Sequence, residues 1–230
     1  MNYEQLLKKY PQEKIDRAIR ILSYKTAVDP LPKNETSTGP ILYVFRHGQT
    51  QDNADFVFSG WRDSPLTEIG RQQALVLATK LGDKKIDYLV SSPQTRAIDT
   101  MKTAMSLNSS AKNLEIRMDE SIQERCYGTF QGKSKLELFL EDEMALHNLR
   151  RSYNYIPEGG ESTEAVVKRV FGFCEYIVKF MKENKLNVAV SCHGNSIRGF
   201  RKFFENLTDE QTATIETPLA QDYAAYHIPD

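Results

Sequence analysis

The stretch I-L-Y-V-F-R-H-G-Q-T, residues 41–50, begins with five consecutive apolar residues. An unbroken apolar run of this length is typical of a strand that is buried on both faces of a parallel sheet. The run ends in Arg46, His47 and Gly48, which places a fixed positive charge beside a titratable nucleophile. A strand that carries such residues at its tip predicts both an α/β core and a ligand site at one edge of it.

Strands and helices are predicted to alternate through the rest of the chain. Further strands are expected over residues 86–92, 114–118, 187–192 and 223–228. Helices are expected over residues 67–81, 93–107 and 196–206, in a segment that ends near 148, and in one that includes 166–181. This alternation predicts a three-layer α/β/α sandwich with a mostly parallel central sheet, and ligands of such folds bind beyond the carboxyl ends of the strands.

Residues 1–40 precede this pattern and differ from it. Residues 1–25 have a helical apolar stripe that is interrupted by Pro11, and residues 29–40 are rich in Pro, Thr and Asn, as in a linker. We therefore expect an N-terminal helical arm and linker over 1–40, and a catalytic domain over 41–230. The arm is either a helix packed on the domain or an interaction arm.

Composition narrows the class of partner. The 230 residues include 30 Lys and Arg against 31 Asp and Glu, a net charge of -1, which gives no reason to expect nucleic acid or an anionic membrane. The three cysteines are scattered, which suits a reducing compartment. The N-terminus lacks the apolar core of a signal peptide, and no apolar run approaches the ~18 residues of a membrane span. We expect a soluble, cytoplasmic protein, and a homodimer is compatible with the sequence.

Two histidines and two arginines follow the predicted strands. Arg46 and His47 end the first, Arg96 opens the helix after the second, and His193 ends the strand over 187–192. Either His-Gly pair alone is often only a tight turn. Together these residues indicate a bound phosphate, because guanidinium groups pair with phosphate oxygens and a histidine ring can form a covalent phosphohistidine. Two arginines and a second, protonated histidine would do the work of a metal, and the sequence has no metal-ligand pattern.

Glu124 is the candidate proton donor for the leaving group. A carboxyl group in a partly desolvated site can stay protonated near neutral pH and act as a general acid. The alternative is that Glu124 and Arg125 form an ion pair on the surface.

Four blocks of the sequence resemble the histidine phosphatase superfamily, and within it the cofactor-dependent phosphoglycerate mutases. They are R-H-G-Q-T at 46–50, S-S-P-Q-T-R-A at 91–97, E-R-C-Y-G at 124–128 and C-H-G-N-S at 192–196. The resemblance extends over about residues 41–228.

The resemblance implies a role for each matching residue. His47 would be phosphorylated, Arg46, Arg96 and His193 would surround the phosphoryl group, and Glu124 would transfer the proton. Substrate-binding roles would fall to Thr50, Asn53, Ser59, Gly60, Arg125, Tyr127, Lys135, Arg150, Arg151, Gly194 and Asn195. Of these, Tyr127, Lys135, Arg150 and Arg151 would bind the carboxylate and distal phosphate, unless the two adjacent arginines lie on a solvated helix face.

The implied reaction is the interconversion of 3-phosphoglycerate and 2-phosphoglycerate, a step of glycolysis and gluconeogenesis, primed by 2,3-bisphosphoglycerate and independent of metal. Two alternatives stay open: a phosphatase that hydrolyses a small phosphomonoester, and a non-catalytic module that binds a phosphorylated ligand. The sequence departs from the mutases at Gln49, Thr50 and Asp52, and it lacks the long insertion before G-G-E-S. It also stops soon after the last predicted strand, where many mutases continue into a tail that covers the site. Water is therefore expected to compete for the phosphohistidine.

Overall fold

A five-stranded sheet lies at the centre of the computed structural model, which describes residues 3–23, 28–36 and 38–229. The strands are β1 (Ile41–Arg46), β2 (Tyr88–Ser91), β3 (Ile116–Met118), β4 (Val188–Cys192) and β5 (Ala224–His227). Their order in the sheet is β3-β2-β4-β1-β5. The pairings among β1 to β4 are parallel, and β5 runs antiparallel to β1. The predicted mostly parallel sheet is confirmed.

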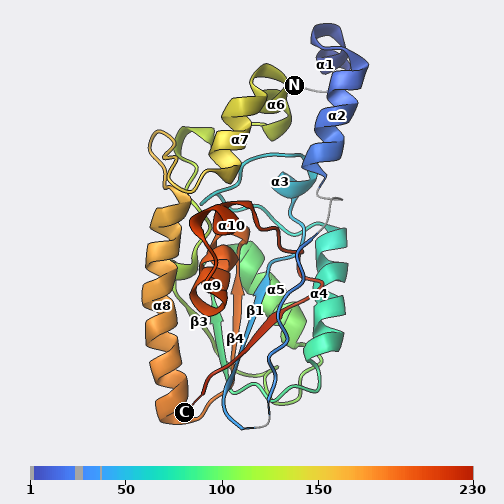
Figure 1. The fold of residues 1–230 in the computed structure, drawn as a ribbon. Coiled ribbons are helices and arrows are strands. Elements are labelled where there is room, and N and C mark those ends of the chain that lie inside the picture. The colour runs from blue at the N-terminus through green and yellow to red at the C-terminus, as the bar shows by residue number, and fades with distance from the viewer. Residues whose placement is uncertain (1–2, 24–27, 37, 230) are drawn as a thin grey trace.

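Helices cover both faces of the sheet (Figure 1). One face carries α4 (Glu68–Leu81) and α5 (Thr95–Met105), and the other carries α8 (Thr163–Asn184) and α9 (Gly194–Glu205). The remaining helices are α1 (Tyr3–Lys9), α2 (Gln12–Leu22), α3 (Gln51–Ala54), α6 (Lys135–Glu141), α7 (Glu143–Arg151) and α10 (Asp209–Thr214), with 3₁₀ turns at Glu120–Ile122 and Gly128–Phe130. The three-layer prediction is therefore confirmed.

The apolar run of β1 explains the layering. Successive strand residues point to opposite faces, so Leu42 and Val44 pack in the cluster that contains α8 and α9 residues. Tyr43 and Phe45 pack in the cluster that contains α4 and α5 residues. All four side chains are buried, because both faces of this central strand are covered.

The N-terminal helices pack on the domain near α3, which follows the carboxyl end of β1 (Figure 1). Ile15 and Leu22 of α2 are buried in a third apolar cluster with Phe139 of α6 and Leu146 of α7. An exposed ion pair between Arg17 and the carboxylate of α7's first residue lies beside the cluster. The described residues of the arm therefore form packed helices, with Pro11 between α1 and α2. Residues 24 and 25 of the predicted helix lie outside the described residues.

The segment expected to be a linker is ordered against the domain where it is described. The backbone N–H of Ala225 in β5 donates to the Pro32 carbonyl (2.8 Å), and the N–H of Asn34 donates to the Ala225 carbonyl (3.0 Å). Residue 37 of this segment is not described. The segment thus pairs with the outer edge of β5 instead of crossing solvent.

Two other features differ from the sequence prediction. The expected helix ending near residue 148 is two helices, because the Asp142 side chain accepts a hydrogen bond from the Ala145 N–H and caps α7. The short helices α3 and α10 were not predicted, since each has too few residues for a periodic apolar pattern. Within the described residues, no helix is both long and apolar enough to span a membrane.

Candidate active site

The sheet register brings the candidate site residues together. Arg46 is paired with Cys192, and Ser91 with Ser191, so the next residues of three neighbouring strands leave the same edge of the sheet side by side. The His47 N–H donates to the Cys192 carbonyl (3.1 Å), which continues the ladder one residue beyond β1. The ring centroids of His47 and His193 are 5.1 Å apart. The two His-Gly pairs thus belong to one site.

His47 has a defined free nitrogen. Its ring is buried, and Nδ1 lies 2.7 Å from the carbonyl oxygen of Gly48. A carbonyl only accepts hydrogen bonds, so Nδ1 must carry the proton and Nε2 must carry the lone pair. This is the tautomer that a nucleophile needs.

Arg96 is fully buried and is oriented by two backbone carbonyls. Its Nη1 donates to the Arg62 carbonyl (2.9 Å) and its Nη2 donates to the Gly60 carbonyl (2.8 Å). Arg46 is tied through Nη1 to the Thr217 carbonyl (3.1 Å). Among the described residues, Nε of Arg46, Nε of Arg96 and Nδ1 of His193 are buried and have no hydrogen-bond partner. Unsatisfied buried nitrogens on three clustered side chains are the pattern expected of an anion site.

Glu124 is buried beside them, so it is not part of a surface ion pair. Its Oε1 accepts hydrogen bonds from the Arg125 N–H (2.8 Å), the Asn195 N–H (3.2 Å) and the Asn195 side-chain amide (2.9 Å). Burial by itself would raise the pKa of Glu124. The hydrogen bonds, together with the charges of Arg96 and Arg46, outweigh burial and hold that pKa below its ordinary value. The expectation of a protonated Glu124 is therefore wrong for this set of partners, which favours the carboxylate.

The two histidines are neutral in this environment. Burial, followed by the charges of Arg96 and Arg46, lowers the pKa of His47 well below the usual histidine value. Burial and the charge of Arg96 likewise lower the pKa of His193, with a further contribution from His47. The expectation of a protonated His193 is thus wrong for these surroundings, which favour the neutral ring. An anion among these groups would favour its protonation.

A small cavity of about 50 Å³ opens onto these groups, room for a few water-sized groups. Its lining residues are Arg46, His47, Asn53, Ser59, Gly60, Arg96, Glu124, Tyr127, Lys135 and Arg150. We call it the nucleophile cavity. It joins most of the residues that the sequence singled out, from six separate parts of the chain.

A second cavity of about 40 Å³ adjoins the first, and Arg46, Tyr127 and Arg150 line both. The other residues that line it are Arg151, Gly194, Arg198, Glu216 and Thr217. We call it the arginine cavity. Arg150 and Arg151 line it from the end of α7, so the alternative of a solvated helix face does not hold.

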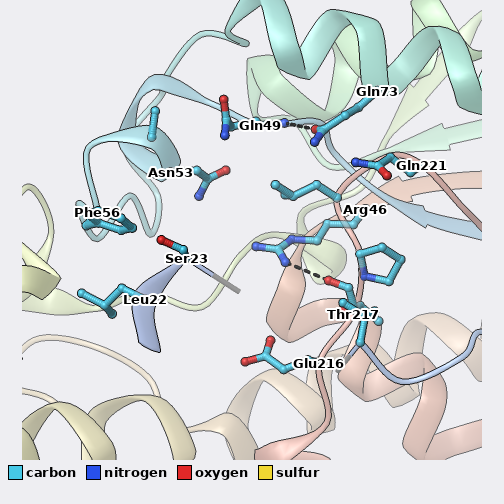
Figure 2. A pocket seen from close by; sticks show the side chains of 14 residues that line it. Leu22, Ser23, Arg46, Gln49, Asn53, Phe56, Gln73, Glu216, Thr217 and Gln221 are labelled. Carbon is cyan, nitrogen blue, oxygen red and sulfur yellow. Dashed lines mark hydrogen bonds between the residues drawn. The ribbon is translucent and has the colours of Figure 1, made fainter. Parts of the chain in front are cut away.

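A larger cavity of about 480 Å³, which we call the outer cavity, is also lined by Arg46. It lies between the arm and the loop that contains Thr217 (Figure 2). Its walls mix apolar residues such as Leu22 and Phe56 with the amide side chains of Gln49, Gln73 and Gln221. Figure 2 shows the Arg46 guanidinium in the middle of the view, beside Thr217. Arg46 therefore lines the roomy outer cavity as well as the two small cationic ones.

Two predicted substrate-binding residues lie elsewhere. The Arg125 guanidinium is fully buried and donates to the carbonyls of Glu161 (2.6 Å), Leu149 (2.8 Å) and Tyr155 (2.7 Å). Its predicted contact with substrate is therefore wrong, because every terminal nitrogen is used to hold the surrounding loops together.

The Thr50 side chain is also directed away from both cavities. Its Oγ1 accepts from the Asn53 N–H (3.2 Å), while the Asn53 Oδ1 accepts from the Thr50 N–H (3.2 Å). This reciprocal cap starts α3 and orients Asn53, which does line the nucleophile cavity. Thr50 thus positions a lining residue instead of lining the cavity itself.

Three more predicted residues contact or line the two small cavities: Asn195, Gly194 and Lys135. The Asn195 amide bridges the Glu124 carboxylate and the Tyr127 hydroxyl (2.9 and 3.1 Å). Gly194 begins α9 and lines the arginine cavity. Lys135 lines the nucleophile cavity while its Nζ donates to the Val57 carbonyl (2.6 Å).

Sequence reasoning missed several residues that hold the site. Ser92 Oγ lies 2.8 Å from Nε2 of His193, and the Gln94 side chain joins the Gly60 carbonyl (2.8 Å) to the Glu124 N–H (3.0 Å). Both residues belong to the block S-S-P-Q-T-R-A that contains Arg96. Their position directly after a predicted strand could have indicated a place at the site. Arg198 follows Asn195 by three residues on α9, close to one helical turn. Glu216 had no local signal.

Metal ligation finds no support in the described part of the chain, where no group of three or more His, Cys, Asp and Glu side chains could hold an ion.

Comparisons with known proteins agree with this geometry. Residues 42–225 match the model of the histidine phosphatase superfamily, branch 1. A 2,3-bisphosphoglycerate-dependent phosphoglycerate mutase of Cytophaga hutchinsonii is 33% identical over 178 residues, covering 77% of this chain and 83% of that protein.

Two solved structures are similar in fold. Bacillus stearothermophilus YhfR has a TM-score of 0.72 at 25% identity, covering 81% of this chain and 90% of that one. A mycobacterial glucosyl-3-phosphoglycerate phosphatase in complex with VO3 has a TM-score of 0.71 at 26% identity, covering 81% and 92% of the two chains.

Proposed function

The chain belongs to branch 1 of the histidine phosphatase superfamily, and we propose that it moves a phosphoryl group through a covalent phosphohistidine at His47. The preferred reaction is the interconversion of 3-phosphoglycerate and 2-phosphoglycerate, primed by 2,3-bisphosphoglycerate. One observation carries the proposal: the lone pair of a neutral His47 lies in the same small cavity as Arg46, Arg96 and the Glu124 carboxylate.

The first half-reaction phosphorylates the enzyme. Nε2 of His47 attacks phosphorus, the bond from phosphorus to the substrate oxygen breaks, and protonated Glu124 gives its proton to that oxygen. Glu124 takes up this proton from solvent when the substrate binds, because the phosphate charge opposes Arg46 and Arg96, whose charges otherwise help to hold the pKa of Glu124 down. Arg96, oriented by the Arg62 and Gly60 carbonyls, stabilises the charge on the transferring group.

The second half-reaction returns the phosphoryl group. A hydroxyl oxygen of phosphoglycerate attacks phosphorus, the phosphorus–nitrogen bond breaks, and the electron pair returns to Nε2 of His47. The hydroxyl proton passes to the Glu124 carboxylate, which is then protonated for the next first half-reaction. Over the two half-reactions Glu124 gives up one proton and takes one back, and no metal ion takes part in the proposed steps.

The arginine cavity supports a substrate with a second anionic group. Arg150 and Arg198 are buried beside the nucleophile cavity, at the place where a carboxylate or second phosphate of phosphoglycerate would lie. A phosphatase whose substrates have an uncharged alcohol part does not need cations there. The names of the curated mutase relatives support the same choice.

A phosphatase is the second candidate. The outer cavity of about 480 Å³ leaves room beside Arg46 for a substrate larger than phosphoglycerate. The names of similar structures include glucosyl-3-phosphoglycerate phosphatase and α-ribazole phosphatase. In this reaction water attacks the phosphohistidine, its proton passes to Glu124, and inorganic phosphate is released.

The decisive assay supplies 3-phosphoglycerate with a trace of 2,3-bisphosphoglycerate and measures both products. A mutase forms 2-phosphoglycerate with little free phosphate, whereas a phosphatase releases phosphate in proportion to turnover. Phosphate release alone would replace the preferred reaction by the second candidate.

Labelling with radioactive bisphosphoglycerate tests the nucleophile. We expect an acid-labile, base-stable label on the wild-type protein and none on His47→Gln. The matched control is His147→Gln, which changes an exposed histidine of α7 and should keep the label. A label that persists in His47→Gln would contradict the phosphohistidine mechanism.

A further inference from the structure

The arginine cavity already contains an anion of the protein itself. Four guanidinium groups line it, from Arg46, Arg150, Arg151 and Arg198, and Glu216 contributes a carboxylate. Glu216 forms an ion pair with Arg151, and its Oε1 lies 3.9 Å from Nη2 of Arg150. Figure 2 shows its side chain below Arg46 and Thr217, on the same loop as Thr217.

Glu216 is held in place by the N-terminal segment. Its backbone N–H donates to the Asp29 carboxylate (2.9 Å), and its carbonyl accepts from the Asp29 N–H (3.2 Å). The segment around Asp29 is anchored in turn, because Nη2 of Arg201 donates to the Pro30 carbonyl (3.2 Å). Asp29 lies outside residues 42–225, which match the family model. The contact therefore joins a residue outside the matched domain to a loop within it.

One carboxylate does not neutralise the cavity. Burial, and next the charge of Arg151, lower the pKa of Arg198 to about 10, and Glu216 acts in the opposite direction. With four cations and one carboxylate, the lining still favours a second anionic group. That group would have to share Arg150 and Arg151 with Glu216, or displace it. Two carboxylates at one pair of guanidiniums repel each other, which costs binding free energy.

We propose that Glu216, positioned by Asp29, sets the specificity of the arginine cavity by competing with the carboxylate of the substrate. The inference rests on the proposed function, since it assumes that the phosphoryl group of the substrate binds at His47. It predicts weaker binding of carboxylated phosphomonoesters than the four arginines would otherwise provide, with no effect on substrates whose tail is neutral.

Equilibrium binding tests this directly. Titration calorimetry compares 3-phosphoglycerate with glycerol 3-phosphate, in which a CH₂OH group replaces the carboxylate. All proteins carry His47→Gln, so that neither ligand is turned over. We expect Glu216→Gln to tighten 3-phosphoglycerate about fivefold to tenfold, the range of a partly buried charge contact, and to change glycerol 3-phosphate by less than about twofold.

Two further variants isolate the contact. Glu210→Gln removes the same charge from an exposed position on α10 and should leave both affinities unchanged. Asp29→Ala keeps the Glu216 carboxylate but removes the side-chain contact to the Glu216 backbone N–H, and it should tighten 3-phosphoglycerate in the same direction by a smaller factor. In the Glu216→Gln background, Asp29→Ala should add nothing, because a positioning residue acts only through the group it positions.

Several results would overturn the inference. An unchanged or reduced preference for 3-phosphoglycerate in Glu216→Gln would show that the carboxylate only stabilises the loop. Equal tightening of both ligands would indicate a general charge effect instead of competition at the carboxylate subsite. An effect of Asp29→Ala that persists without Glu216 would remove the positioning role of Asp29.

Failure of the proposed function gives a different signature. A missing phosphohistidine label would refute the mechanism but leave the binding ratio measurable, because binding is compared without turnover. Phosphate release in the product assay would change the reaction and likewise leave this comparison intact.

Discussion

His47 and His193 are buried as neutral imidazoles, and the guanidinium groups of Arg96 and Arg46 favour that neutral form in both. Their depressed pKa values arise first from burial and next from the charge of Arg96. The neutral form keeps the His47 lone pair available below the ordinary histidine pKa of about 6.5. The arginines that we propose as phosphoryl-binding groups thus also help to keep the proposed nucleophile neutral.

This arrangement predicts how stability depends on pH. Above about pH 6.5 both histidines are neutral in the folded and unfolded chains, and they contribute no pH dependence. Below about pH 6.5 the two histidines bind protons in the unfolded chain but stay neutral in the folded chain, so the free energy of unfolding falls as the pH falls. The slope is at most about 1.4 kcal/mol per pH unit for each histidine. Urea denaturation between pH 5 and 7 measures it.

The variant that carries both His47→Gln and His193→Gln is the control. It should lose this slope, and an equally steep slope in the variant would contradict the assignment. Glu124 acts in a lower window. Because its folded pKa is depressed, its contribution is present above its unfolded pKa of about 4.5 and is lost as pH falls through the folded value.

At the scale of elements, the end of β1 meets the start of α4 through two glycines. A Cβ on Gly48 would overlap the Gly70 carbonyl oxygen, and a Cβ on Gly70 would overlap the Gln49 carbonyl oxygen. The Gly48 N–H also donates to Thr100 Oγ1 of α5 (3.1 Å). Close backbone contact between these elements therefore fixes where His47 leaves the strand.

Gly48→Ala tests this contact. We expect a loss of about 1–3 kcal/mol in the free energy of unfolding and a loss of activity of at least about a hundredfold, because the backbone must shift beside His47. The matched control is Gly172→Ala in the exposed middle of α8, where an added Cβ meets nothing within 4 Å. The control should gain about 0.5–1 kcal/mol from helix propensity and keep its activity. Full activity in Gly48→Ala would refute the role of the contact.

At the scale of the molecule, the arm and the domain share one apolar cluster. Ile15 and Ala18 of α2 are fully buried there, and Phe58, which follows β1 and α3 in the chain, is buried with them. The same arm continues to Leu22, which lines the outer cavity, and to the segment that holds Glu216. The arm thus contributes apolar residues to the shared cluster and also supplies residues that line or position the cavities.

Ile15→Ala measures this coupling. We expect the single unfolding transition to lose about 2–4 kcal/mol, since the substitution leaves a cavity in the shared cluster. Ile69→Ala, an exposed isoleucine of α4, makes the same chemical change and should cost less than about 0.5 kcal/mol. A separate early transition of the arm, with an unchanged main transition, would show that the arm folds independently.

The sequence by itself determined the sheet and the chemistry at its edge. Apolar runs such as 41–45 and 187–192 have a local cause, burial on both faces, and the residues after them must leave from the carboxyl ends. This is why His47, Arg96 and His193 could be placed together before any coordinates. The break at Asp142 was harder to predict, because a single capping side chain decides it.

Only the tertiary structure decided the states and directions of the side chains. Glu124 is a carboxylate because the N–H of its neighbour Arg125, together with Asn195 and two arginines that are distant in sequence, outweighs its burial. The Arg125 side chain donates to carbonyls of α7 and of the loop after it, although its neighbour Glu124 lines the nucleophile cavity. Glu216 meets Arg151 from a loop whose backbone is bonded to Asp29, 187 residues earlier in the chain. Periodicity records which face of an element is buried, whereas charge balance and orientation depend on non-local partners that no local pattern encodes.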